Sequence, residues 1–105
     1  MRTPNSFQDF TRQFHQDVEL VHPGCWSDDP DARNSIYEDF KELHGKVIVD
    51  ELAAFFHELI DSPDIDLEKL WNKFGKSDFI LKSEGVQNLI HDFLHWSQHL
   101  GENRS

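Results

Sequence analysis

The feature that most constrains the fold is the spacing of the apolar residues, which recur every three or four positions along most of the chain. This spacing places them on one face of an α-helix, whereas a half-buried strand needs strict alternation, and no convincing alternating stretch occurs. The apolar helical stripes cover approximately residues 6–17, 30–44, 47–61, 66–75 and 83–99. Short connections between them predict an all-α fold, a single compact bundle of about five or more helices.

Capping signals support these helix boundaries. Ser, Thr, Asn and Asp are favoured as N-caps, Pro at the first helical position and Gly just after a helix end. The expected N-caps are Asn5 or Ser6, Asp29 (followed by Pro30), Asp66 and Ser83, and the expected closing glycines are Gly45 and Gly75. The short apolar run at residues 79–81 fits either an extended segment or a helical turn. The predicted core residues are Phe10, Phe14, Phe40, Phe55, Phe56, Leu70, Phe74, Leu89 and Phe93.

The chain length and the rarity of cysteine set the broad class. A chain of 105 residues suits one domain, so we expect a single helical domain over 1–105 with frayed tails at 1–4 and 101–105. No stretch approaches the roughly 20 apolar residues of a membrane span, and the first residues lack the apolar region of a signal peptide. We therefore expect a cytoplasmic protein. Cys25 is the only cysteine, which excludes an intrachain disulfide.

The charge is strongly acidic and unevenly distributed. Twenty acids against ten bases give a formal net charge of −10. Residues 9–68, called here the acidic segment, hold 16 acids and four bases, whereas residues 69–105 hold four acids and five bases. Such a segment repels nucleic acid phosphates and accelerates encounter with basic proteins. Charge alone is equally compatible with a role in solubility.

Three groups of residues invite a catalytic or metal-binding interpretation. His91, His95 and His99, called here the histidine stripe, have the i, i+4 spacing that can chelate zinc, but they point away from the apolar face and lack the glutamate of a metalloprotease motif. Cys25 with His15 or His22 lacks an evident oxyanion site. The paired carboxylates do not have calcium-loop spacing. We therefore predict no enzyme activity, no cofactor and no metal, and keep the histidine stripe as the one weak metal candidate.

A tetrapeptide carries a resemblance to a known family. The first helix has aromatic spacing and ends in Phe14-His15-Gln16-Asp17, an acidic linker and an amphipathic helix follow, and the terminal helix bears Trp96. Phe74-Gly75 is followed shortly by Phe79. This layout resembles the immunity proteins of contact-dependent growth inhibition systems, small α-helical bacterial proteins whose N-terminal segment often reads aromatic-Phe-His-Gln-Asp-aromatic. In this chain Gln13 and Val18 stand at the two aromatic positions.

The resemblance implies an antitoxin that binds and neutralises the cognate C-terminal toxin domain of a large secreted protein, with neither nucleic acid nor membrane as partner. A nuclease toxin must be basic to hold phosphates, so an acidic inhibitor can block its active site. The expected contacts lie in the acidic segment: Asp17, Glu19, Trp26, Asp28, Asp29, Asp31, Tyr37, Glu38, Asp39 and Glu42. Three alternatives remain. One is an acidic nucleic-acid mimic that inhibits a DNA- or RNA-binding protein, and another is a small metal-binding helical protein that uses the histidine stripe. The third, a small helical enzyme, is disfavoured because no catalytic constellation assembles.

Overall fold

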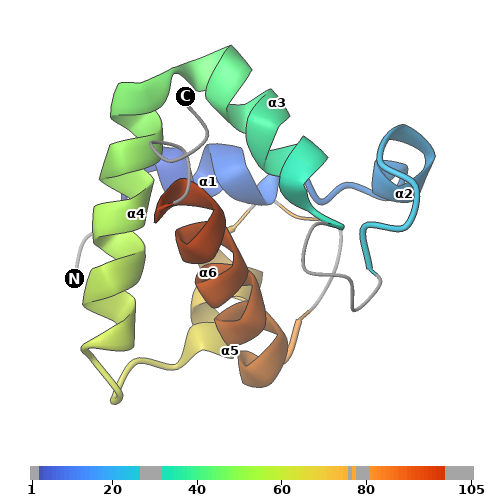
Figure 1. The fold of residues 1–105 in the computed structure, drawn as a ribbon. Coiled ribbons are helices and arrows are strands. Elements are labelled where there is room, and N and C mark those ends of the chain that lie inside the picture. The colour runs from blue at the N-terminus through green and yellow to red at the C-terminus, as the bar shows by residue number, and fades with distance from the viewer. Residues whose placement is uncertain (1–2, 27–31, 76, 78–80, 99–105) are drawn as a thin grey trace.

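The fold is all-α and forms one helical bundle, as the apolar spacing predicted. The computed structural model describes residues 3–26, 32–75, 77 and 81–98, and contains no strand within these ranges. Figure 1 shows how the helices are arranged. In chain order the elements are α1 (Asn5–Thr11), α2 (Val18–Val21), α3 (Asn34–His44), α4 (Lys46–Ile60), α5 (Leu67–Lys69), the π-helix η1 (Leu70–Phe74) and α6 (Ser83–Gln98).

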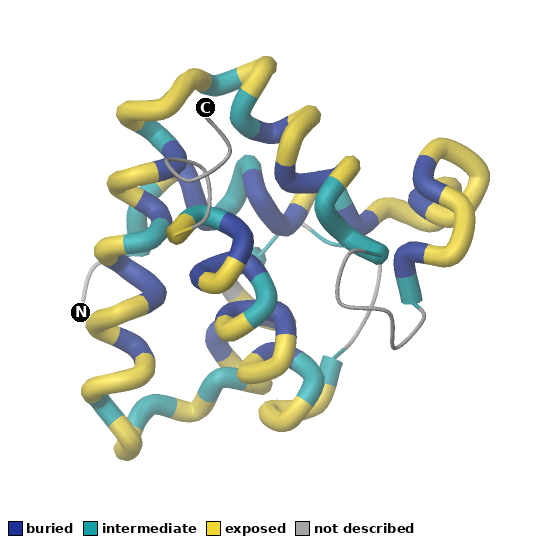
Figure 2. The backbone as a smooth tube through the Cα atoms, viewed as in Figure 1, coloured by how far each residue is buried: buried dark blue, intermediate teal, exposed yellow. Residues whose placement is uncertain are grey.

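The three long helices form the frame of the bundle. α3 and α4 meet at a corner where Gly45 adopts a φ of 90°. This left-handed conformation is strained for residues with a side chain, which explains the predicted glycine at that boundary. α6 packs against both α3 and α4, and α1 crosses behind them and packs on α4 (Figure 1). Figure 2 shows the buried stripe of each long helix turned toward this shared interior.

The core is a cluster of aromatic rings centred on Phe10. Its ring contacts those of α3, α4 and α6, with centroid distances of 6.0 Å to Tyr37, 5.5 Å to Phe56 and 5.2 Å to Phe93. Most of these pairs are edge-to-face, a geometry that aromatic quadrupoles favour. Every predicted core residue whose side chain the structure describes is buried. The side chain of Phe74 lies outside the described part of the chain. The Phe10 ring therefore packs α1 against α3, α4 and α6.

The first helix is shorter than predicted and its cap differs. It ends at Thr11 rather than near Asp17, because hydrogen bonds from the amides of Gln13 and Phe14 to carbonyls three residues earlier turn the chain there. Phe14 and Val18 are still fully buried, so the turn keeps the apolar face inward. The residue before the helix is Pro4, in an extended conformation, and neither Asn5 nor Ser6 caps it.

The other boundaries agree with the sequence to different degrees. Asp66 caps α5, accepting a hydrogen bond of 3.1 Å from the amide of Lys69. The chain then continues as η1 and stops at Gly75, where an added Cβ would lie 2.5 Å from the carbonyl oxygen of Trp71. α3 begins at Asn34 with Arg33 as its N-cap, later than the predicted start at Asp29 and Pro30, because Arg33 is not in a helical conformation. Asp29 and Pro30 themselves lie outside the described residues, as do residues 79–80 and both chain ends beyond 3–98. Among the described helices, none is long and apolar enough to cross a membrane.

Candidate functional site

The acidic segment places its charges outward. Every described acid between residues 9 and 68 is exposed except Asp9, which is half-buried. Asp28, Asp29 and Asp31 lie outside the described residues, so the structure does not place them. The described acids are spread over α1, α2 and the residue before it, α3, α4, the connection to α5, and α5 itself. The question for a binding site is therefore which of them are already engaged within the molecule.

Several of these acids form internal contacts. Glu38 accepts a 3.0 Å hydrogen bond from the indole Nε1 of Trp96, which ties α3 to α6. Asp39 lies 3.1 Å from Nε2 of His22. Glu51 accepts a hydrogen bond from the Ser6 hydroxyl at 2.9 Å. These carboxylates contribute to the fold, so replacing them would test stability together with binding.

The remaining acids of the predicted site are free of such contacts. Within the described part of the chain, no side-chain hydrogen bond or ion pair engages the carboxylate of Asp17, Glu19 or Glu42. Together with the partly engaged Asp39, they occupy α2, the residue preceding it and the adjoining flank of α3, which we call the acidic face. A shallow depression of about 400 Å³, lined by Gln13, Asp39, Glu42 and Leu43, lies on this flank.

A histidine bridge fixes α2 to α3. The imidazole of His22 is almost buried, with Nδ1 2.8 Å from the Ser35 hydroxyl and Nε2 3.1 Å from Asp39. Ser35 and Asp39 lie one turn apart on α3, so one ring can span both. Such a chain of hydroxyl, imidazole and carboxylate also occurs in hydrolases, where it acts together with oxyanion donors. Here its direct structural consequence is that the acidic face keeps a fixed geometry across two helices.

A second cluster fixes the beginning of α3 to α6. The guanidinium of Arg33 donates from Nε to Asp92 at 2.8 Å and from Nη1 to the carbonyl of Cys25 at 2.7 Å. The Tyr37 hydroxyl donates to the same Asp92 oxygen. Because the side chains of Arg33 and Asp92 are only 16% and 15% exposed, this ion pair is largely shielded from water. The cluster therefore connects α6 to the beginning of α3 and to the backbone at Cys25.

Burial and charge perturb the groups around this cluster. Burial, reinforced by the negative charge of Asp92, raises the pKa of Tyr37 well above its usual value. Burial by itself would lower the pKa of Arg33, but the hydrogen bond and charge of Asp92 outweigh it and raise that pKa. Burial, with the charge of Glu19, raises the pKa of the Cys25 thiol. Cys25 is fully buried and free of a disulfide, so it behaves as a packing residue.

The two aromatic anchors expected from the sequence differ in position. Tyr37 is not on the surface: its ring is fully buried, stacks on Phe10 and hydrogen-bonds Asp92, so it cannot reach a partner in this structure. The sequence was ambiguous here because Tyr37 falls on the apolar stripe of α3. Trp26 is half-buried against Phe14, with a centroid distance of 5.6 Å, and retains an exposed part.

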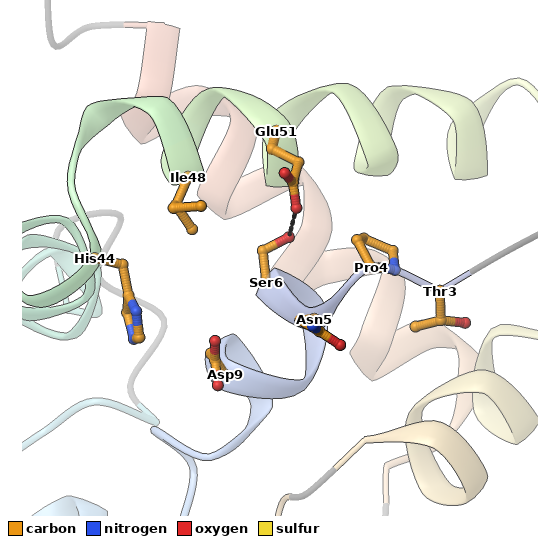
Figure 3. A pocket seen from close by; sticks show the side chains of 8 residues that line it. All are labelled: Thr3, Pro4, Asn5, Ser6, Asp9, His44, Ile48 and Glu51. Atoms are coloured by element: carbon orange, nitrogen blue, oxygen red, sulfur yellow. Dashed lines mark hydrogen bonds between the residues drawn. The ribbon is translucent and has the colours of Figure 1, made fainter.

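A second, larger depression lies away from the acidic face. It measures about 490 Å³ and opens between the beginning of α1 and the corner of α3 and α4 (Figure 3). Its lining comprises Thr3, Pro4, Asn5, Ser6, Asp9, His44, Ile48 and Glu51. Glu51 already holds Ser6, and Asp9 lies 3.5 Å from Arg12. Sequence reasoning missed this depression because α1 and α4 are distant in the chain.

The histidine stripe partly follows the prediction of a solvent-facing surface. His91 and His95 are exposed on α6, opposite the buried Val86, Leu89, Ile90 and Phe93, whereas His99 lies outside the described residues. No group of three or more possible metal ligands comes together within the described part of the chain. Comparisons of the chain with protein-family models, with curated proteins and with solved structures found no match.

Proposed function

We propose that this protein is an immunity protein that binds a cognate toxin domain and blocks its active site. The toxin is the C-terminal domain of a large secreted protein of a contact-dependent growth inhibition system, and we expect a basic nuclease. The proposal rests on the resemblance carried by Phe14-His15-Gln16-Asp17 and on the acidic segment. It places the protein in the cytoplasm of the producing cell, where a delivered toxin would act.

The observation that carries the proposal is the set of unengaged carboxylates of the acidic face. Asp17, Glu19 and Glu42 are exposed and are not used by the fold within the described residues. Exposed like charges repel one another and contribute little to stability, so their concentration supports a role outside the fold. A basic partner would remove that repulsion on binding.

The proposed mechanism is occlusion guided by long-range attraction. A nuclease holds phosphates with Lys and Arg side chains, and an acidic surface competes for the same side chains. Opposite charges raise the association rate, whereas the buried centre of an interface sets the dissociation rate. Neutralisation then requires only a complementary surface that covers the toxin's substrate groove.

Two other functions make different predictions. An acidic nucleic-acid mimic would bind many DNA- or RNA-binding proteins and would be competed away by duplex DNA or RNA. A metal-binding protein would take up zinc or nickel through the histidine stripe, and replacement of His91 and His95 by glutamine would abolish that uptake. The immunity proposal instead expects one specific partner and full function in the glutamine variant.

The direct test is co-expression with the toxin domain encoded next to this chain's gene. Cells that express the toxin domain alone should die, and cells that also express this protein should survive. Purified components should form a one-to-one complex by size-exclusion chromatography with light scattering. As a matched control, the same toxin should not be neutralised by an unrelated acidic helical protein. Continued cell death in the presence of the folded chain, or no complex, would reject the proposal.

A further inference from the structure

Two large aliphatic side chains are exposed at consecutive positions of α2. Leu20 is 80% and Val21 is 59% exposed. Scattered exposed apolar residues are common and carry no meaning alone. These two are adjacent in a four-residue helix that displays them at the edge of the molecule, where α2 stands out from the bundle (Figures 1 and 2).

The rest of α2 is fixed to the bundle, so the two side chains are presented from a defined position. Val18 is fully buried at the beginning of the helix. His22 follows the helix and is held by Ser35 and Asp39. A side chain that is already positioned loses less entropy on binding than one on an unsupported loop. The helix therefore has the mechanical support that an interface anchor needs.

The charges around α2 define the chemistry of its partner. Asp17 and Glu19 precede Leu20 and Val21 within about one helical turn and are both exposed, and Asp39 lies next to the helix through its contact with His22. Between residues 13 and 32 the sequence contains no Lys or Arg. A complementary surface therefore has an apolar depression surrounded by Lys or Arg side chains, the arrangement of an apolar interface centre with a charged rim.

A comparable apolar side chain elsewhere lacks this charge pattern. Val47, at the beginning of α4, is 79% exposed. Its neighbour Lys46 places an ammonium group 2.7 Å from Asp50, so the local charge is mixed. Leu43 is also exposed, but it lines the depression with Asp39 and Glu42 and so belongs to the acidic face. Val47 therefore serves as the control.

We infer that Leu20 and Val21 of α2 are the apolar anchor of the toxin interface and insert into an apolar depression that Lys or Arg side chains surround on the toxin. The inference rests on the proposed function, and it adds the location of the contact and the chemistry of the surface that receives it. Acids on the rim accelerate encounter, and the two aliphatic side chains retain the complex. A second copy of this chain is a poor occupant, because its own acidic rim would be repelled.

The test compares Leu20→Ala/Val21→Ala with Val47→Ala as the control, using the purified cognate toxin domain as the probe. Both variants should fold like the wild type by circular dichroism, since all three side chains are exposed. The α2 variant should dissociate roughly 10- to 100-fold faster with little change in association rate, and the control should bind like the wild type. A single Leu20→Lys variant should weaken binding further, and Val47→Lys should not.

The outcomes separate the inference from the proposed function. A wild-type complex whose dissociation rate does not change in the α2 variant would overturn the inference and leave the immunity role standing. Equal or greater weakening by the control would also overturn it, as would concentration-dependent self-association that the α2 variant abolishes. If the wild type neither binds nor protects, the proposed function itself fails.

Discussion

The cluster of Arg33, Tyr37 and Asp92 makes a quantitative prediction about stability. Replacing Asp92 with Ala leaves a guanidinium that is 16% exposed without its carboxylate, and a buried Tyr37 hydroxyl without its acceptor. Breaking a fully buried ion pair in this way costs about 3–5 kcal/mol. Because water still reaches part of both side chains, we expect a loss of about 2–4 kcal/mol. The conservative Asp92→Asn keeps an oxygen acceptor for Tyr37 and should cost about 1–2 kcal/mol.

Urea denaturation followed by circular dichroism at neutral pH measures these losses. A change of about 3 kcal/mol corresponds to a fall in melting temperature of roughly 10–20 °C for a domain of this size. Asn88→Ala, at an exposed position one turn earlier on α6, is the control and should stay within about 0.5 kcal/mol of the wild type. If Asp92→Ala costs less than about 1 kcal/mol, the cluster is not a shielded ion pair and α3 is not held to α6 in this way.

Three further predictions concern the core and the titratable groups. Phe10→Ala should cost about 3–5 kcal/mol by urea denaturation, because Phe10 is fully buried at the centre of the aromatic cluster; a loss below about 1 kcal/mol would contradict its central position. The pKa of Tyr37 is raised in the folded protein, so stability from its neutral form is present below pH ~10 and is lost as the pH rises further. Because the Cys25 thiol also titrates at alkaline pH, the comparison is made in a Cys25→Ala background. There, Tyr37→Phe should reduce the fall in the free energy of unfolding above pH ~10. Replacing all three residues of the histidine stripe with glutamine should change the free energy of unfolding, measured by urea denaturation, by no more than about 0.5 kcal/mol per site.

Apolar spacing could predict the three helices that frame the bundle because they are long and amphipathic, but it did not predict the four-residue α2. α3, α4 and α6 each bury one stripe of a helix, and Gly45 and Asp66 mark boundaries through local backbone chemistry. The first helix shows the limit of this signal. Phe7, Phe10 and Phe14 have helical spacing, yet the chain turns after Thr11 and Phe14 still reaches the core. Spacing reports which residues are buried more reliably than which hydrogen bonds the backbone forms.

The candidate site could be predicted only in part, because its organisation depends on tertiary contacts. Charge counting indicated the acidic segment, but it could not separate Glu38 and Asp39, which contact Trp96 and His22, from the unengaged Asp17. These contacts join α3 to residues well separated in sequence, and no local pattern encodes them. Tyr37, in contrast, falls on the apolar stripe of α3 and points inward as that position indicates, so it is not a surface contact.

The association rate of the toxin domain tests the central claim most directly. Stopped-flow kinetics at two salt concentrations would compare the wild type with Asp17→Lys/Glu19→Lys/Glu42→Lys, which alters only unengaged carboxylates of the acidic face. The matched control, Glu58→Lys/Asp61→Lys/Asp64→Lys, makes the same change in net charge at exposed sites on the far end of α4 and the turn after it.

We predict that the wild-type association rate falls as salt rises, because charges are screened beyond a Debye length of roughly 8–10 Å. The acidic-face variant should associate much more slowly at low salt, and its association rate should depend much less on salt. In the control variant, both the association rate and its salt dependence should change far less. A wild-type rate that is independent of salt, or equal losses in the two variants, would contradict recognition of a basic toxin through the acidic face.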